Sequence, residues 1–323
     1  MKKIIKVISV VIAIVVVGVV VAGTYVKVFL PKASPIQDIK IDLTKERIER
    51  GKYLAHHVAV CMDCHSTRDW TQFAGPLSGN LGAGGEKFSK DMGFPGSIYA
   101  ANITPFNIGD WTDGELFRTI TTGVNKNGKA LFPVMPYLHY GQMDQEDVYS
   151  IIAYIRTLEP IKSERPEREL DFPVSLLVNT MPQEAKLVKK PNESDKVAYG
   201  KYLVNMAACV DCHSKTDKGA VIPGTEFGGG MNFIQPAGIV RSANITPHNE
   251  TGIGLWSSEA FVQRFKQYTD SGYVSSKLTP NDLNSAMPWH MYAGMSKDDL
   301  EAIYAYLHSL DPIDNLVTKF EKK

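Results

Sequence analysis

The sequence predicts an all-α chain, with two tandem helical domains preceded by a single N-terminal transmembrane helix. Three observations predict this organisation. The chain opens with a long apolar stretch, the remainder contains the same series of short motifs twice, and each copy holds one Cys-x-x-Cys-His motif, at Cys61–His65 and at Cys209–His213. The order of the motifs is kept while their spacing drifts, as expected when loops change length around a retained fold. A chain of 323 residues is long enough for two ordinary domains.

Residues 1–30 are predicted to anchor the chain in a membrane. The stretch Val7–Val26 has no charged side chain, and its twenty residues would span about 30 Å as a helix, the thickness of a bilayer hydrocarbon core. Lys2, Lys3 and Lys6 precede it, so the positive-inside rule keeps the N-terminus in the cytoplasm and the rest outside. The alternative is a cleaved signal peptide, which starts with the same charges. We expect a retained anchor because the apolar stretch is longer than the ~7–15 residues usual in such peptides.

The charge balance excludes one class of partner. The chain has 35 basic and 35 acidic side chains, and 31 basic and 35 acidic remain without the four lysines in or beside the anchor. Such a mild negative charge argues against nucleic acid as a partner. It leaves the choice among protein partners open.

The internal repeat sets the domain boundaries. Four motifs recur in the same order: Gly-Lys-Tyr-Leu at 51–54 and 200–203, Ala-Asn-Ile-Thr-Pro at 101–105 and 243–247, Met-Pro at 135–136 and 287–288, and Ala-Tyr-x-x-x-Leu-x-Pro at 153–160 and 305–312. They predict two homologous domains, which we call repeat 1 (44–160) and repeat 2 (193–313). Residues 31–43 are then a linker and 314–323 a tail. A charged, proline-rich connector spans 161–192, and its apolar stretch Phe172–Val178 is expected to pack on a domain surface.

Each repeat is expected to begin and end with a helix. The first helix starts near Thr44 or Ser194, both good capping residues, and its apolar face contains a glycine, Gly51 or Gly200. A glycine within a helix costs about 1 kcal/mol relative to alanine, so its recurrence suggests a close helix crossing; simple inheritance from the duplication is the alternative. The expected crossing partners are the last helices, at 144–158 and 296–310, with Tyr154 and Tyr306 in the gap.

The Cys-x-x-Cys-His motif is the attachment signature of c-type haem. Two cysteines three residues apart on one helical turn can each form a thioether to a haem vinyl group, and the next histidine then reaches the iron. The sequence therefore predicts two covalently bound haem c groups, attached through cysteine and histidine side chains: Cys61, Cys64, His65, Cys209, Cys212 and His213. A zinc site made from both cysteine pairs, a thioredoxin-like pair and a disulfide framework are the alternatives.

The distal iron ligands are expected to be Met135 and Met287. Each precedes a proline, which disfavours helix at the preceding residue and suggests a loop that presents the sulfur. Met143 and Met295 also recur, but they stand directly before helix caps, where an apolar residue packs against its own helix. The rival ligands are two histidines close to the Met-Pro motifs, His139 and His290, which would give bis-histidine iron.

Other polar groups are expected to orient the proximal histidines, because ligating histidines usually donate their second ring N–H to an acceptor. The backbone carbonyls of Pro76 and Pro223 are candidates, since they follow the haem histidines at similar distances. Six further side chains are candidates for the haem edge or propionates, with turn or core roles as the alternative: Asn102, Thr104, Trp111, Asn244, Thr246 and Trp256.

The whole series of motifs resembles the cytochrome c domains in the haem subunits of bacterial membrane-bound alcohol and aldehyde dehydrogenases. The resemblance covers both repeats, about three quarters of the chain. It implies all-α domains with His/Met haems that pass electrons from a dehydrogenase towards quinone or a terminal oxidase. Those subunits typically carry three haem motifs and are held to the membrane differently, so the particular partner does not carry over.

The expected function is electron transfer by a membrane-anchored dihaem cytochrome c, between a dehydrogenase or quinone-linked donor and a respiratory acceptor. His65 and Met135 would hold one iron, and His213 and Met287 the other, with no catalytic residue required. The predicted location is the bacterial cytoplasmic membrane, single-pass, with the haem domains on the periplasmic side. The alternative is a dihaem enzyme such as a cytochrome c peroxidase, whose two irons should differ in distal ligand because one must open for peroxide.

Overall fold

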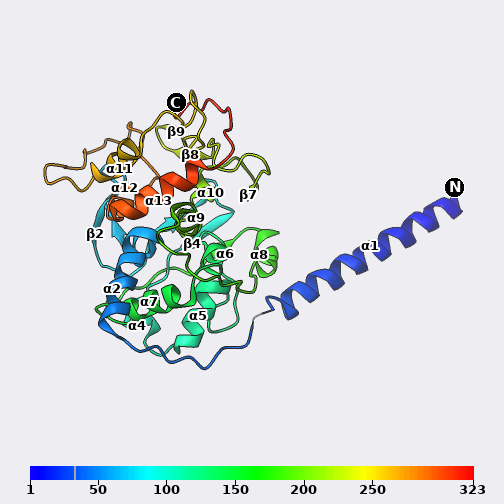
Figure 1. Ribbon diagram of the computed structural model, residues 1–323. Coiled ribbons are helices and arrows are strands. Elements are labelled where there is room, and N and C mark those ends of the chain that lie inside the picture. Colours follow the sequence, from blue (N-terminus) through cyan, green and yellow to red (C-terminus); the bar gives the residue numbers. More distant parts are fainter. Residues whose placement is uncertain (33) are drawn as a thin grey trace.

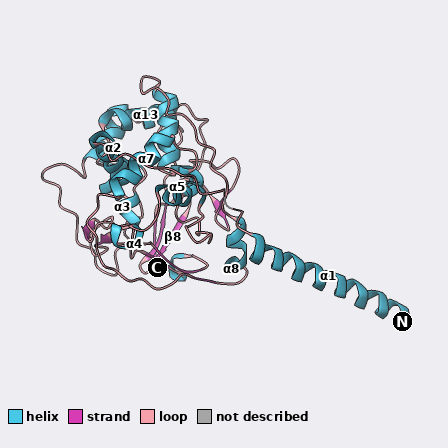
Figure 2. Ribbon diagram, turned by 90° about the horizontal axis from the view of Figure 1, so that it is seen from below, coloured by secondary structure: helices cyan, strands magenta, loops and turns pink. Residues whose placement is uncertain are grey.

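The computed structural model describes residues 1–32 and 34–323. Helix α1 (Lys2–Phe29) has no buried residue and projects away from the rest of the molecule, with the N-terminus at its far end (Figures 1 and 2). It is long and apolar enough to cross a membrane. The predicted N-terminal helix is therefore present, and its length and composition fit a membrane span or a signal sequence.

Each repeat is organised around a crossing of its first and last helices. In repeat 1, α2 (Lys45–Tyr53) packs against α7 (Gln145–Ile155); in repeat 2, α9 (Lys196–Met206) packs against α13 (Lys297–His308). Side chains cap all four N-termini by accepting a backbone N–H: Thr44, Asp144, Asp195 and Ser296. Three of these caps were predicted, but α9 is capped by Asp195 and not by Ser194.

The glycines at the crossings are required by close packing. A Cβ atom on Gly51 would overlap the backbone carbonyl of Ser150 and lie 2.9 Å from Cβ of Tyr154. A Cβ atom on Gly200 would overlap the carbonyl of Ala302 in the same way and lie 3.0 Å from Cβ of Tyr306. The predicted close crossing is confirmed in both repeats.

The first helices differ by one residue. Repeat 1 has one residue more than repeat 2 between its Gly-Lys-Tyr-Leu and Cys-x-x-Cys-His motifs. The structure accommodates this residue as a π-helical turn, η1 (Leu54–Val58), which directly continues α2. A single π-turn absorbs an inserted residue without ending the helix. Both repeats still enter the Cys-x-x-Cys-His motif through one left-handed residue, Val60 or Ala208, despite the difference in length.

Further helices complete the helical part, and most of them occur in pairs. The paired ones in repeats 1 and 2 are α3 (Cys61–Cys64) and α10 (Cys209–Cys212), α5 (Asp113–Thr122) and α11 (Ser258–Lys266), and α6 (Tyr137–Tyr140) and α12 (Trp289–Tyr292). Repeat 1 also has α4 (Pro105–Ile108) and the 3-10 turn η2 (Lys90–Met92), and the connector has α8 (Val174–Leu177) and the 3-10 turn η3 (Val178–Thr180).

Short antiparallel strands also occur, so the predicted all-α class describes only the helical core. The strands are β1 (Thr67–Arg68), β2 (Leu77–Gly79), β3 (Lys87–Phe88), β4 (Gly96–Tyr99), β5 (Glu169–Leu170), β6 (Thr216–Asp217), β7 (Ala220–Val221), β8 (Asn232–Gln235), β9 (Gly238–Arg241) and β10 (Phe320–Lys322). They pair as β1-β2, β3-β4-β5, β6-β7 and β10-β9-β8. Most lie in the long segments that follow the haem motifs, where strand pairing satisfies backbone groups that no helix uses.

The connector and the tail each return to the repeat that precedes them. Strand β5 of the connector pairs with β4, and β10 of the tail pairs with β9. Further along, the connector donates from Lys186 N to Gly141 O at 2.7 Å and from Val188 N to Met143 O at 3.3 Å. The apolar stretch Phe172–Val178 was expected to pack on a domain surface, but within it Val178 alone is buried, and Phe172 is 82% exposed. These other contacts of the connector, and not its apolar stretch, therefore hold it on repeat 1.

One hydrophobic core cluster runs through both repeats. It contains Leu54 and Ile152 from repeat 1 together with Leu203 and Leu300 from repeat 2, all fully buried. The length of the chain and its internal repeat predict two domains. The repeats instead share apolar surface, which brings the elements around the two Cys-x-x-Cys-His motifs close together.

Candidate haem sites

Both Cys-x-x-Cys-His motifs begin a one-turn helix after a sharp change of direction. The residue before α3, Val60, has φ 46°, and the residue before α10, Ala208, has φ 50°. Left-handed backbone is unfavourable for side chains other than glycine, and a β-branched valine accepts it only where the surroundings impose it. The same turn in both repeats sets each motif helix at an angle to the long helix before it.

The proximal histidines are oriented by backbone carbonyls. His65 Nδ1 lies 2.6 Å from Ala101 O, and His213 Nδ1 lies 2.7 Å from Ala243 O. With Nδ1–H as the donor, Nε2 carries a free lone pair, which is the arrangement of a metal-ligating histidine. Burial lowers the pKa of both rings below the ordinary value, although the carbonyl hydrogen bond opposes this, so both are neutral at pH 7.

The acceptors are not the predicted ones. Pro76 O accepts a hydrogen bond from Asp69 N at 2.9 Å instead of one from His65, and in both repeats the acceptor is the alanine of the Ala-Asn-Ile-Thr-Pro motif. The prediction of Pro76 and Pro223 is therefore wrong. Sequence distance misled it, because the true acceptors follow the histidines by 36 and 30 positions.

Two glycines that the sequence reading missed bring these carbonyls to the histidines. Gly84 N donates to His65 O at 2.9 Å, and a Cβ atom on Gly84 would lie 2.5 Å from the carbonyl group of Ala101. Gly229 N donates to His213 O at 2.7 Å, and its Cβ would lie 2.5 Å from Ala243 C. Both glycines have φ +74°. The signal was available, because each repeat has adjacent glycines at this position, 84–85 and 228–230.

The Asn and Thr of the Ala-Asn-Ile-Thr-Pro motif fasten the chain that follows the last helix. Asn102 Oδ1 accepts hydrogen bonds from Thr104 N and Oγ1, and its Nδ2 donates to Ile161 O at 2.7 Å. Asn244 and Thr246 repeat these bonds, with Ile313 O as acceptor at 2.7 Å. These side chains serve a buried turn, the alternative left open by the sequence.

The two tryptophans have a similar structural use. The backbone carbonyl of Trp111 accepts a hydrogen bond from Arg156, and that of Trp256 accepts one from Tyr304 Oη at 2.7 Å. Both donors belong to the last helix of the repeat or its end. Their contacts join the middle of each repeat to its C-terminal helix.

The cysteines of both motifs lie in a desolvated environment. All four are free thiols, and desolvation by burial raises the pKa of Cys61 and of Cys209 to about 12. Thioredoxin-like cysteines have lowered pKa values, so this environment does not suit them. Among the described residues, no group of three or more Cys, His, Asp or Glu side chains could hold a metal ion. The two cysteine pairs therefore do not converge on a zinc site.

The rival distal histidines are engaged elsewhere. His139 lies with Nδ1 2.9 Å from Asn205 Oδ1 and Nε2 2.9 Å from Asp211 Oδ1. His290 Nε2 lies 2.9 Å from Ser275 Oγ and 3.1 Å from Phe73 O. Each ring would have to break these bonds to reach an iron.

The repeated methionines fall into two kinds. Met143 and Met295 are fully buried in the core, as a packing role requires. Met135 and Met287 are half-buried at its edge, in tight turns where Tyr137 N donates to Met135 O at 2.7 Å and Trp289 N to Met287 O at 2.8 Å. Met135 and Met287 are thus not enclosed by the core as Met143 and Met295 are.

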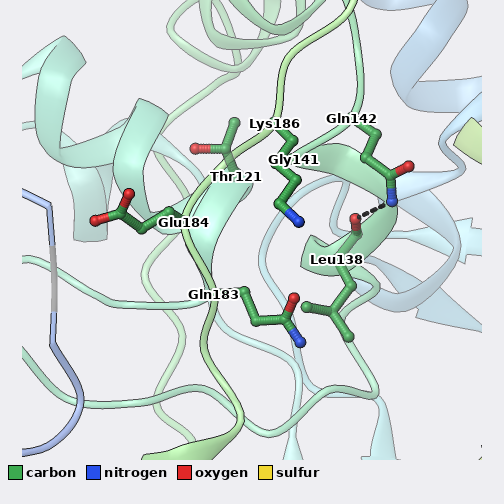
Figure 3. A pocket seen from close by; sticks show the side chains of 7 residues that line it. All are labelled: Thr121, Leu138, Gly141, Gln142, Gln183, Glu184 and Lys186. Carbon is green, nitrogen blue, oxygen red and sulfur yellow. Dashed lines mark hydrogen bonds between the residues drawn. The ribbon is translucent and has the colours of Figure 1, made fainter.

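A small pocket elsewhere has none of this chemistry. It measures about 150 Å³ and lies where the connector crosses repeat 1, between residues 183–186 and α6 (Figure 3). Its lining is polar and aliphatic: Thr121, Leu138, Gly141, Gln142, Gln183, Glu184 and Lys186. No cysteine, histidine or methionine belongs to it, and it is far smaller than a haem.

Comparison with known proteins agrees with the motifs. Residues 197–311 match the family model for cytochrome c. The fructose dehydrogenase cytochrome subunit of Gluconobacter japonicus is 29% identical over 307 residues, covering 90% of this chain and 57% of that protein. The cytochrome c subunit of a quinone alcohol dehydrogenase from Gluconobacter oxydans is 25% identical over 288 residues, covering 84% and 56%.

A third relative is closer to this chain in length. The diheme c-type cytochrome of Cereibacter sphaeroides is 24% identical over 268 residues, covering 79% of this chain and 83% of that protein. By contrast, the chain spans less than two thirds of the length of the dehydrogenase subunits. The resemblance to cytochrome c subunits of dehydrogenases that the motifs predicted is confirmed.

Proposed function

We propose that this chain is a membrane-anchored dihaem cytochrome c that passes electrons from a dehydrogenase or quinone-linked donor to a respiratory acceptor. For repeat 2 the proposal is supported by the match of residues 197–311 to the family model for cytochrome c. We infer a second haem site in repeat 1 because His65 has the same surroundings as His213 in repeat 2. Each follows a Cys-x-x-Cys helix and is oriented by an alanine carbonyl that packs on a left-handed glycine.

The proposed iron ligands are His65 with Met135 and His213 with Met287. Each histidine has Nδ1 occupied and Nε2 free. Each methionine lies half-buried in a turn, whereas the competing histidines are held by other side chains and carbonyls. His/Met ligation gives a higher reduction potential than harder ligand pairs, which suits a respiratory carrier.

A bound haem c supplies a one-electron Fe(III)/Fe(II) couple, and the residues of this chain determine how that couple works. His65 and His213 remain neutral and in one tautomer, so no proton needs to move at the ligand when the charge changes. The fully buried side chains Met62, Leu54 and Leu203 exclude water from the sides of the motifs. Electron transfer through the protein then needs no nucleophile or general base from the chain.

Electron transfer between the two sites is favoured by their contacts. His139 in α6, four residues after Met135, bonds to Asp211 within the second haem motif. In return, Met291 O of α12, four residues after Met287, accepts from His57 Nδ1 in the turn before the first motif, at 2.9 Å. Each methionine-bearing segment therefore touches the haem helix region of the other repeat.

The anchor places both sites outside the cytoplasm. We propose that α1 is retained as a single-pass membrane helix with Lys2, Lys3 and Lys6 on the cytoplasmic side. The chain then lies on the periplasmic side of the bacterial membrane. A dehydrogenase donor is supported by the names of the relatives, and a terminal oxidase or another cytochrome is the acceptor that the potential of His/Met iron suits.

A dihaem peroxidase predicts an asymmetry between the two irons that these sites do not support. Such an enzyme needs one iron with an open or exchangeable distal position. Both repeats have Met-Pro in the same kind of turn. The relatives reported above are dehydrogenase subunits and a dihaem cytochrome, so they add no support for a peroxidase.

The proposal is tested on the full chain in detergent. The pyridine haemochrome assay per polypeptide should give two haems, and near-infrared magnetic circular dichroism of the oxidised protein should show two His/Met irons. Met135→Leu and Met287→Leu remove the sulfur at nearly constant volume, and each should abolish half of the His/Met signal. Met143→Leu is the matched control and should leave it unchanged. One haem per chain, or a high-spin or bis-histidine iron in the wild type, would overturn the proposal.

A further inference from the structure

The connector presents an apolar surface beside the membrane helix. Phe172, two residues before α8, is 82% exposed, and Leu177, the last residue of α8, is 44% exposed. Figures 1 and 2 both show α8 next to the end of α1 at which the chain enters the rest of the molecule. Exposure of both apolar side chains to water is unfavourable, and transfer into a neighbouring apolar environment would be favourable.

This surface is held in place by the backbone before and within it. Strand β5 pairs with β4 immediately before Asp171, and Asp171 N donates to Pro95 O at 2.9 Å. Ser175 N donates to Asp171 O at 2.8 Å, which closes the turn around Phe172. The carboxylate of Asp171 is paired with Lys90 at 2.7 Å. Phe172 is therefore exposed at a defined position, and the charge beside it is offset.

The surface lies against a residue from the uncharged part of α1. Helix α1 contacts both α8 and η3. A Cβ atom on Gly23 would lie 3.8 Å from Cδ2 of Leu176, so α8 packs against a position of α1 without a side chain. Gly23 belongs to the stretch Val7–Val26 that lacks charges. Because the two residues are in contact, Leu176 would lie at the same depth in a bilayer as Gly23.

The position of Gly23 relative to Lys27 fits a contact in the membrane interface. Gly23 precedes Lys27, the first charged residue after the apolar stretch, by one helical turn, or about 6 Å. Helices that lie in the membrane interface bury their apolar face about 5–10 Å deep. Tyr25 and Phe29 stack at 5.4 Å on the same end of α1, and aromatic rings are enriched at this level of a membrane.

We propose that the α8 segment, residues 172–177, is a second membrane contact that inserts Phe172 and Leu177 into the periplasmic leaflet of the bilayer. The partner is the lipid itself, because the surface is continuous with the helix that crosses it. This inference rests on the proposed anchor. With two membrane contacts, α1 and residues 172–177, the orientation of the haem sites relative to the membrane is determined.

The test measures the depth of single nitroxide labels on the full chain in phospholipid nanodiscs. Four variants are compared: Phe172→Cys, Leu177→Cys, Val17→Cys in the middle of α1, and Val274→Cys. Val274 is 83% exposed and belongs to the loop that follows α11. Figure 1 shows α11 on the side of the molecule away from α1. With the four native cysteines in thioethers, the introduced cysteine is the one that reacts. Accessibility to oxygen, which partitions into lipid, is compared with accessibility to a water-soluble nickel complex.

The outcomes separate this inference from the proposed anchor. Labels at positions 17, 172 and 177 that all favour oxygen, with the label at 274 favouring nickel, support the second contact. If the label at 17 favours oxygen but the labels at 172 and 177 favour nickel like the one at 274, the second contact is wrong and the anchor is retained. A water-exposed or missing label at 17 overturns the anchor and the inference together.

Discussion

The phenol of Tyr53 in repeat 1 donates to Oδ2 of Asp299 in repeat 2 at 2.5 Å. The Tyr53 hydroxyl also accepts a hydrogen bond from Ser296 N at 2.9 Å, so Tyr53 binds the capped N-terminus of α13. The reverse contact is also present: Tyr202 Oη donates to Asp147 Oδ2 at 2.7 Å and accepts from Asp144 N at 3.0 Å. The first helix of each repeat therefore binds the start of the last helix of the other.

Removal of these hydroxyls is expected to destabilise the protein. A hydrogen bond to a charged group contributes about 1.5–3 kcal/mol, so Tyr53→Phe and Tyr202→Phe should each lower the free energy of unfolding by about 2 kcal/mol in chemical denaturation. Tyr149→Phe is the matched control, because the Tyr149 hydroxyl is exposed and meets only Gln145. If Tyr53→Phe and Tyr202→Phe lower the free energy of unfolding no more than Tyr149→Phe does, the cross-repeat hydrogen bonds do not contribute to stability.

The helix crossings should not tolerate alanine. Gly51→Ala and Gly200→Ala force a Cβ into the carbonyl of Ser150 or Ala302, and separating the helices is expected to cost about 3 kcal/mol each. Gly272→Ala is the control, since nothing lies within 4 Å of its added Cβ. Thermal unfolding followed by far-ultraviolet circular dichroism measures all three. Equal melting temperatures for Gly51→Ala and Gly272→Ala would contradict the crossing.

Two tyrosines in α6 are expected to respond in opposite directions to the same change. Tyr137 is fully buried, and its hydroxyl has no hydrogen-bond partner among the described residues, so Tyr137→Phe should be neutral or stabilise by about 1 kcal/mol. Tyr140 Oη donates to Ala59 O at 2.7 Å, so Tyr140→Phe should destabilise by about 1–2 kcal/mol. Urea unfolding of both variants checks the pair. A destabilised Tyr137→Phe would mean that its hydroxyl has a partner in the haem-loaded protein.

Acidic pH is expected to destabilise the π-turn. Burial, with smaller effects from His57 and Lys52, lowers the pKa of His56 from 6.5 to about 4. The unfolded chain then binds a proton that the folded chain does not, so the contribution of His56 lowers the free energy of unfolding as pH drops from about 6.5 to 4 and does not change above that window. His57, whose pKa burial also lowers, adds to the slope.

The measurement is urea unfolding at several pH values between 4 and 8. His56→Gln should flatten the slope while keeping a polar group near Tyr154 Oη, which lies 2.7 Å from His56 Nε2 in the wild type. A wild-type slope that survives this substitution unchanged would place the titrating group elsewhere.

The features that follow from local patterns could be predicted from the sequence. Thr44, Asp144 and Ser296 cap helices as their residue types and positions suggested. The crossing at Gly51 and Tyr154 followed from a repeated glycine on an apolar face. These predictions succeeded because caps and close crossings leave their signal within one or two helical turns.

The acceptors for the haem histidines could not be predicted in the same way. The chain turns back at Gly84 and brings Ala101 O to His65. The residues next to Ala101 and His65 in the sequence do not indicate this contact. The cross-repeat bonds of Tyr53 and Tyr202 likewise join residues separated by 246 and 55 positions. Only the packing of the two repeats on each other creates them.

The reciprocal tyrosine contacts have the form of an isologous interface, in which residue i meets j and the equivalent of j meets the equivalent of i. Such interfaces normally relate two identical subunits of a dimer. Here the two halves belong to one chain, so the arrangement is that of a fused homodimer. The π-turn breaks its symmetry, because the two histidines in it, His56 and His57, have no counterparts in the second half. One half of this chain can therefore carry a residue that the other lacks, which two identical subunits of a homodimer cannot do.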